Sequence, residues 1–286
     1  MTRKTSAILL ISCPDRPGLV AAITHFLSEH DGNILDLDQH VDMEENVFFA
    51  RIEWDLDRFV IPRDQIRERF GVLAQRFRMT WELHFSDQRT RMAVLVSRAA
   101  HCLYEILAHH EAGDWPVEIP LVISNHAHLE SVVKKHGIDY HHLPVTKGTR
   151  KEQESKVAEL LDQEGIELVA LARYMQILTP EFVSRFPNRL INIHHSFLPS
   201  FTGPRPYHRA YSRGVKNIGA TAHYVTAELD GGPIVEQDVI RVSHRDSVAE
   251  FIRKGKGLEK SVLSRAIWFH LQRKVIVYGN KTMVFE

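Results

Sequence analysis

The chain has 286 residues, of which 44% are hydrophobic; at roughly 150 residues per domain this predicts two globular domains and excludes disordered and disulfide-scaffold proteins. Its 36 Lys and Arg balance 36 Asp and Glu, so no overall positive field is available to bind nucleic acid or an anionic membrane surface. Only two cysteines, a short N-terminal apolar run and no apolar stretch of roughly 18 residues lead us to expect a cytoplasmic protein that acts on a small molecule.

The first 86 residues predict strands and helices in the order βαββαβ, which is that of the ferredoxin-like fold. The strands are indicated by buried or alternating apolar residues, and the helices by apolar residues at helical spacing. The expected elements are strand 7–12, helix 19–27, strands 34–41 and 47–54, a helix from near Pro62 to Phe77, and strand 79–85.

The segment from Cys13 to Val20, with Gly32-Asn33-Ile34 after the helix, resembles the start of an ACT domain. This resemblance covers residues 6–86 and implies a module that binds amino acids and regulates an attached enzyme. The Pro and Gly residues predict a tight turn into a helix N-terminus, whose free N–H groups can receive a carboxylate. The same turn would also serve as a plain connection in a domain used only for self-association. We therefore expect either an amino-acid effector or an oligomerisation role, and a homo-oligomer.

Residues 87–91 are polar and are expected to link the first domain to a second over 92–286. Strands and helices alternate in the second domain, which predicts a mostly parallel, Rossmann-like α/β sheet with ligands beyond the carboxyl ends of its strands. Gly255-Lys256-Gly257 is not a nucleotide-binding fingerprint, because it lacks the third glycine and the strand before it. The expected elements are strand 92–96, helix 101–110, strand 119–124, helix 127–136, strand 139–145, helix 151–164 and strand 168–172.

Three polar residues near two expected chain breaks are candidates for carbonyl chemistry. Asn192 and His194 are two residues apart in an expected strand, so their side chains point to the same side. Pro199 and Gly203 break the chain just after, and Asp230 precedes a Gly-Gly-Pro turn. An amide, an imidazole and a carboxylate can polarise an oxygen, move a proton and orient the imidazole. The chain has 18 His, so the alternative for His194 is that it is an ordinary surface or core histidine without a catalytic role.

A metal site is the competing interpretation of the histidine-rich second domain. Its ligands would come from His194, His195, His208 and His223. The sequence has no HExxH motif and no cysteine pair, and no carboxylate stands at short range among these histidines. We therefore expect no metal.

Three ordered segments resemble the formyltransferases that use 10-formyltetrahydrofolate, over residues 91–280. They are 171–180, 192–203 and 229–234. The resemblance implies that Asn192, His194 and Asp230 are catalytic. It also implies that a folate lies against six further residues. Packing of a loop onto the core is the alternative for the three apolar ones among 175–178. These six are Met175, Gln176, Ile177, Leu178, Ala227 and Glu228.

The departures from this family concern the acceptor of the formyl group. Members that formylate a ribonucleotide amine have a glycine-rich loop after their first strand and a proline after the catalytic histidine. Here residues 96–103 contain no glycine, and His195 stands in place of that proline. Members that formylate transfer RNA add a basic C-terminal domain, which is not expected in this chain of zero net charge.

Water is then the simplest acceptor. An ACT-like domain before such a domain resembles the formyltetrahydrofolate deformylase family, which implies hydrolysis of the folate to formate and tetrahydrofolate without a cofactor. A transferase to an unidentified amine and a non-catalytic folate or amino-acid sensor are the alternatives.

Overall fold

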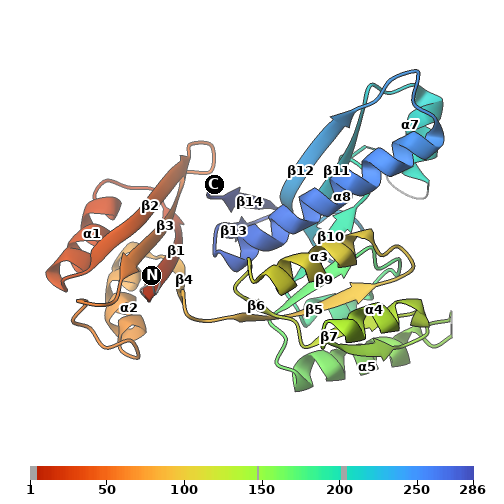
Figure 1. The fold of residues 1–286 in the computed structure, drawn as a ribbon. Coiled ribbons are helices and arrows are strands. Elements are labelled where there is room, and N and C mark those ends of the chain that lie inside the picture. The colour runs from red at the N-terminus through yellow and green to blue at the C-terminus, as the bar shows by residue number, and fades with distance from the viewer. Residues whose placement is uncertain (1–4, 147, 201–204) are drawn as a thin grey trace. The chain divides into compact units, whose positions relative to one another are not determined.

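The computed structural model describes residues 5–146, 148–200 and 205–286, and these form two compact units (Figure 1). The first unit comprises the chain up to Arg89 together with Arg273–Ile276 and Met283–Glu286. The second comprises Thr90–Gln272 and Val277–Thr282. Each unit has its own hydrophobic core, and both are α/β structures.

The first unit contains a four-stranded antiparallel sheet in the order β2-β3-β1-β4, with two helices. This arrangement confirms the ferredoxin-like βαββαβ fold. Leu9 and Ile11 of β1 alternate onto the face covered by the helices, where Ile23 and Phe70 pack against them. The elements are β1 (Ser6–Pro14), α1 (Leu19–Glu29), β2 (Asn33–Asp42), β3 (Val47–Asp55), α2 (Ile66–Phe77) and β4 (Thr80–Phe85).

Helix α2 begins at Ile66 and not near Pro62, where the sequence predicted it. The amide of Gln65 donates to the carbonyl of Pro62 at 2.8 Å, so Pro62 opens a separate turn before the helix. From Ile66 onward the predicted apolar face is correct, since Ile66, Phe70 and Phe77 are buried. The error concerns the boundary and leaves the packing of the helix unchanged.

The second unit is built on a sheet in the order β12-β11-β10-β9-β5-β7-β8, with β6 beside β5. Strands from β10 to β8 are parallel, whereas β11 and β12 are antiparallel to their neighbours, which confirms the mostly parallel sheet. Helix α5 packs its apolar residues on one face of this sheet, and α3 and α8 lie together on the other (Figure 1). Of the described residues, no helix is both long and apolar enough to cross a membrane.

The bounds of these elements follow the sequence pattern, with three differences at prolines and turns. Strand β7 begins after Pro120 and β8 ends before Pro144, because proline cannot donate to a sheet. The helix expected over 127–136 is a short 3-10 turn followed by α4. The elements are β5 (Thr90–Val96), α3 (His101–Ala112), β6 (Val117–Glu118), β7 (Leu121–Ser124), η1 (Ala127–Leu129), α4 (Glu130–Lys135), β8 (Asp139–His142), α5 (Arg150–Gln163), β9 (Leu168–Ala172), α6 (Pro180–Ser184), β10 (Leu190–His194), α7 (Pro206–Arg213), β11 (Asn217–Tyr224), β12 (Ile234–Arg241), α8 (Val248–Leu271), β13 (Val275–Tyr278) and β14 (Lys281–Val284).

Candidate active site

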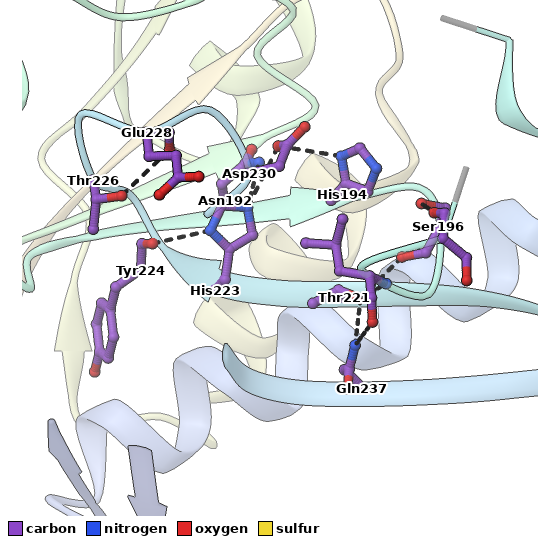
Figure 2. Close-up of polar contacts among 12 residues, drawn as sticks. Asn192, His194, Ser196, Thr221, His223, Tyr224, Thr226, Glu228, Asp230 and Gln237 are labelled. Atoms are coloured by element: carbon purple, nitrogen blue, oxygen red, sulfur yellow. Dashed lines mark hydrogen bonds and ion pairs between the residues drawn. The ribbon is translucent and has the colours of Figure 1, made fainter. Parts of the chain in front are cut away.

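The three polar residues predicted to act together come from two neighbouring parts of the second unit (Figure 2). Asn192 and His194 lie on β10, and Asp230 lies in the turn between β11 and β12. Strand β10 pairs with β11 so that Asn192 stands opposite His223. The side chains of Asn192, His194 and Asp230 point toward one another (Figure 2). Gly203, the second predicted chain break, lies outside the described residues.

His194 and Asp230 form the central contact of the site. Nδ1 of His194 is 3.2 Å from Oδ1 of Asp230, and the two side chains are only 6% and 15% exposed. The hydrogen bond from His194, and then the nearby His223, hold the pKa of the Asp230 carboxyl well below its usual range. Nε2 of His194 is buried and has no partner among the described residues. The carboxylate therefore fixes one ring nitrogen, and the other is left to exchange a proton.

His223 supports this pair, a role that the sequence did not predict. Its Nδ1 donates to the carbonyl of Tyr224 at 2.9 Å, because a carbonyl can only accept. Its Nε2 lies 3.2 Å from Nδ2 of Asn192 and 3.6 Å from Oδ1 of Asp230. Accepting from Nδ2 orients the Asn192 amide, whose second N–H is then available to another acceptor. The only signal in the sequence is the position of His223 in the Gly-Ala-Thr-Ala-His segment.

The turn that carries Asp230 has a strained backbone. Asp230 has a φ of 55°, a left-handed conformation that is uncommon outside glycine and costs about 1–3 kcal/mol. Gly232 is required by close approach, because a Cβ there would collide with the carbonyl of Tyr224. The amide of Tyr224 donates to the carbonyl of Pro233 at 2.9 Å and closes the turn. Strain of this kind is characteristic of functional sites.

A cavity of about 740 Å³ lies beyond the carboxyl ends of β9 and β10 and is lined by all nine predicted site residues. Met175 and Ile177 are 57% and 56% exposed, so core packing does not account for them, whereas Leu178 packs partly against the core. Their loop is anchored beside them, where Tyr174 accepts a hydrogen bond from Gln153 at 2.8 Å. The nine are Asn192, His194, Asp230, Met175, Gln176, Ile177, Leu178, Ala227 and Glu228.

A buried polar cluster forms another wall of the cavity, and the sequence did not predict it. Glu259 of α8 is 1% exposed and accepts hydrogen bonds from Tyr207 at 2.5 Å and from His101 at 2.7 Å. Nε of Arg173 lies 3.3 Å from the same carboxylate. Burial alone would raise the pKa of Glu259, but His101, Arg173 and Tyr207 outweigh it and the pKa is lowered. Gly255 permits this packing, because a Cβ there would collide with the Tyr207 ring.

His101, Cys102 and Glu259 are the one group of described residues close enough to hold a metal ion, with ligand atoms within 4.8 Å of one another. Burial raises the pKa of the Cys102 thiol, so the thiolate that a metal requires is disfavoured. The carboxylate of Glu259 already accepts two hydrogen bonds, from His101 and Tyr207, and is paired with the charge of Arg173. Hydrogen bonding, without a metal ion, therefore accounts for the closeness of His101 and Glu259. The histidines considered as ligands from the sequence, His194, His195, His208 and His223, all line the cavity but form no such group among the described residues.

His195 lies beside His194, with ring centroids 5.2 Å apart. Burial, and then the charge of Arg173, lower the pKa of His195 to about 4. His195 is therefore a neutral imidazole at neutral pH. It adds a polar group to the cavity wall without adding a charge.

Comparisons with known proteins agree with this architecture. The profile of the formyl transferase family matches residues 90–267, and that of the ACT domain family matches residues 7–70. The chain is 53% identical to a formyltetrahydrofolate deformylase of Synechocystis sp. over 98% of both chains, and 48% identical to that of Bacillus subtilis over 97% of this chain and 93% of the relative. The crystal structure of a formyltetrahydrofolate deformylase from Pseudomonas syringae pv. tomato superposes with a TM-score of 0.97 at 44% identity, covering 100% of this chain and 96% of that one.

Proposed function

Because the chain belongs to the formyltetrahydrofolate deformylase family, we propose that it hydrolyses 10-formyltetrahydrofolate to formate and tetrahydrofolate in the cavity that contains Asn192, His194 and Asp230. The reaction is that of a hydrolase acting on a carbon–nitrogen bond, and the residues named here need no cofactor for it. In this proposal the catalytic domain spans 92–286 and is joined by 87–91 to the ACT domain over 1–86.

The folate binds with its pterin against the loop from Met175 to Leu178 and beside Ala227 and Glu228. This placement is supported by the exposure of Met175 and Ile177 on the cavity wall, since large apolar side chains exposed in a concave site favour a ligand. The formyl carbon then lies near His194.

In the chemical step, a water oxygen bonds to the formyl carbon while His194 takes a proton from that water. The negative charge that develops on the formyl oxygen is stabilised by the Asn192 amide, a contribution of about 3–4 kcal/mol if it acts as other oxyanion donors do. The carbon–nitrogen bond breaks as His194 passes its proton to the leaving nitrogen, and the formic acid loses a proton to solvent. Asp230 stabilises the charged imidazole between these steps.

The observation that carries the proposal is the Asp230–His194 contact at 3.2 Å, which leaves Nε2 of His194 unpartnered in the described part of the chain. The test is to supply 10-formyltetrahydrofolate alone to the full-length protein and to measure formate. We expect formate to appear without any amine. Formate that depends on an added amine would indicate a transferase, and tight folate binding with no formate would indicate a sensor.

The hydrogen bonds and the ion pair of Glu259 favour water over an amine as the acceptor of the formyl group. A carboxylate facing the cavity could hold an ammonium or amine group, but Glu259 already accepts from His101 and Tyr207 and pairs with Arg173. An amine would have to displace these buried partners, at the cost of leaving them unsatisfied.

For the ACT domain we propose amino-acid binding or self-association. The turn before α1 places Gly18 at a φ of 90°, and α1 begins without a side-chain cap, so its first N–H groups are available to a carboxylate. A panel of amino acids added to the formate assay tests binding, and sedimentation of the full chain tests a homo-oligomer. Both cysteines are free and buried, which fits the cytoplasm that we propose as its location.

A further inference from the structure

The hairpin of β13 and β14 contacts the Asp230 turn at two points. Nδ2 of Asn280, in the hairpin turn, donates to the carbonyl of Gly231 at 2.9 Å. Oγ1 of Thr282, on β14, donates to the carbonyl of Ile234. These two carbonyls lie on either side of Gly232-Pro233, so the hairpin holds both ends of the segment that follows Asp230. All of these residues belong to the second unit.

The Asp230 turn requires such support, because its backbone conformation is unfavourable. The left-handed φ of Asp230 persists only when surrounding contacts define it. Tyr224, at the end of β11, donates to Pro233, and within the turn Gly231 donates to Glu228 at 3.2 Å. Among the described residues, the side-chain hydrogen bonds to the carbonyls of Gly231 and Ile234 come from the hairpin.

We propose that Asn280 and Thr282 are positioning residues for Asp230. This inference rests on the proposed function, in which Asp230 acts through His194. The carboxylate of Asp230 is 3.2 Å from His194 and 3.6 Å from His223, distances that a small shift of the turn would break. Displacing a catalytic group by about 1 Å can cost about 100-fold in rate. Met175 and Ile177, against which the folate is proposed to bind, belong to a different loop from the Asp230 turn.

The test uses variants that keep side-chain size and remove the hydrogen-bond donor. Asn280→Asp replaces the amide nitrogen by an oxygen that repels the carbonyl of Gly231, and Thr282→Val replaces the hydroxyl by a methyl group. We expect kcat for formate release from 10-formyltetrahydrofolate to fall about 10-fold in each variant, part of the loss that a full displacement would cause. KM should change less than twofold, and Thr282→Ser, which keeps the hydroxyl, should restore kcat.

Lys281→Ala is the matched control, because Lys281 is an exposed residue between the two positions on the same hairpin. It should leave kcat unchanged, and thermal melting should show that all four variants fold. Wild-type kcat in folded Asn280→Asp and Thr282→Val would overturn the positioning role, as would equal losses in Thr282→Ser and Thr282→Val. Absence of formate from the wild-type protein would instead contradict the proposed function itself.

Discussion

Asp230 and His194 contact each other across 3.2 Å although they lie on different elements, the turn after β11 and the end of β10. Asp230→Asn keeps the shape of this contact and removes its charge. We expect formate release to fall by about 10²–10⁴-fold, because the charged imidazole loses its counter-ion. The measurement is kcat with 10-formyltetrahydrofolate. Asp238→Asn, on the exposed edge strand β12 where Asp238 pairs with Arg265, is the control and should keep wild-type turnover.

The same carboxyl makes the stability of the protein depend on pH. The pKa of Asp230 is lower in the folded protein than its ordinary value of about 3.9, so its contribution is fully present above that pH. It is lost as the pH falls through the folded-state pKa. We expect the difference in free energy of unfolding between wild type and Asp230→Asn to be larger at pH 5 than at pH 3. Urea titrations at the two pH values measure it, and a difference that grew at pH 3 would contradict the assignment.

Asn192 is expected to act on the transition state and not on folate binding. Asn192→Ala removes the amide that His223 orients at 3.2 Å. We expect kcat to fall by about 10²–10³-fold with little change in KM, as found for other oxyanion donors. Steady-state kinetics separate the two constants. A rise in KM with unchanged kcat would instead make Asn192 a binding residue.

Met175 and Ile177, the exposed apolar residues of the proposed folate site, should affect binding without affecting the fold. Met175→Ala and Ile177→Ala remove side chains that are 57% and 56% exposed, so each should change the free energy of unfolding by less than about 0.5 kcal/mol. KM for the folate should rise about 10-fold, which corresponds to about 1.4 kcal/mol of lost apolar contact. Phe182→Ala, in the core beside this loop, is the contrasting variant, with an expected loss of about 3–5 kcal/mol in stability.

Glu259 lines the cavity, and its substitution is also expected to lower the free energy of unfolding. Glu259→Gln keeps the size of the side chain but leaves Arg173 without its buried counter-charge. Removing one partner of a buried ion pair costs about 3–5 kcal/mol, and denaturant unfolding should show a loss of that order. Glu250→Gln, near the exposed start of the same helix, should be close to neutral.

The sequence predicted most elements and part of the site because both follow local rules. Asn192 and His194 share a side because side chains alternate along a strand, and the apolar residues of β9 and α2 fall at the spacing of their elements. The start of α2 was wrong by about one turn, since a turn opened by Pro62 and a helix beginning there leave the same local pattern.

Asp230 was already a candidate partner of His194 from the sequence, but only the tertiary structure decided how it reaches His194 and which other distant groups join them. His223 and Asp230 reach β10 through an antiparallel pairing, an irregularity between Ala222 and His223, and a left-handed turn. Glu259 meets His101, Arg173 and Tyr207 because α8, α3 and the ends of β9 and α7 converge on one cavity. Local propensity extends over a few residues, whereas these contacts are selected by the packing of whole elements, so no spacing in the sequence encodes them.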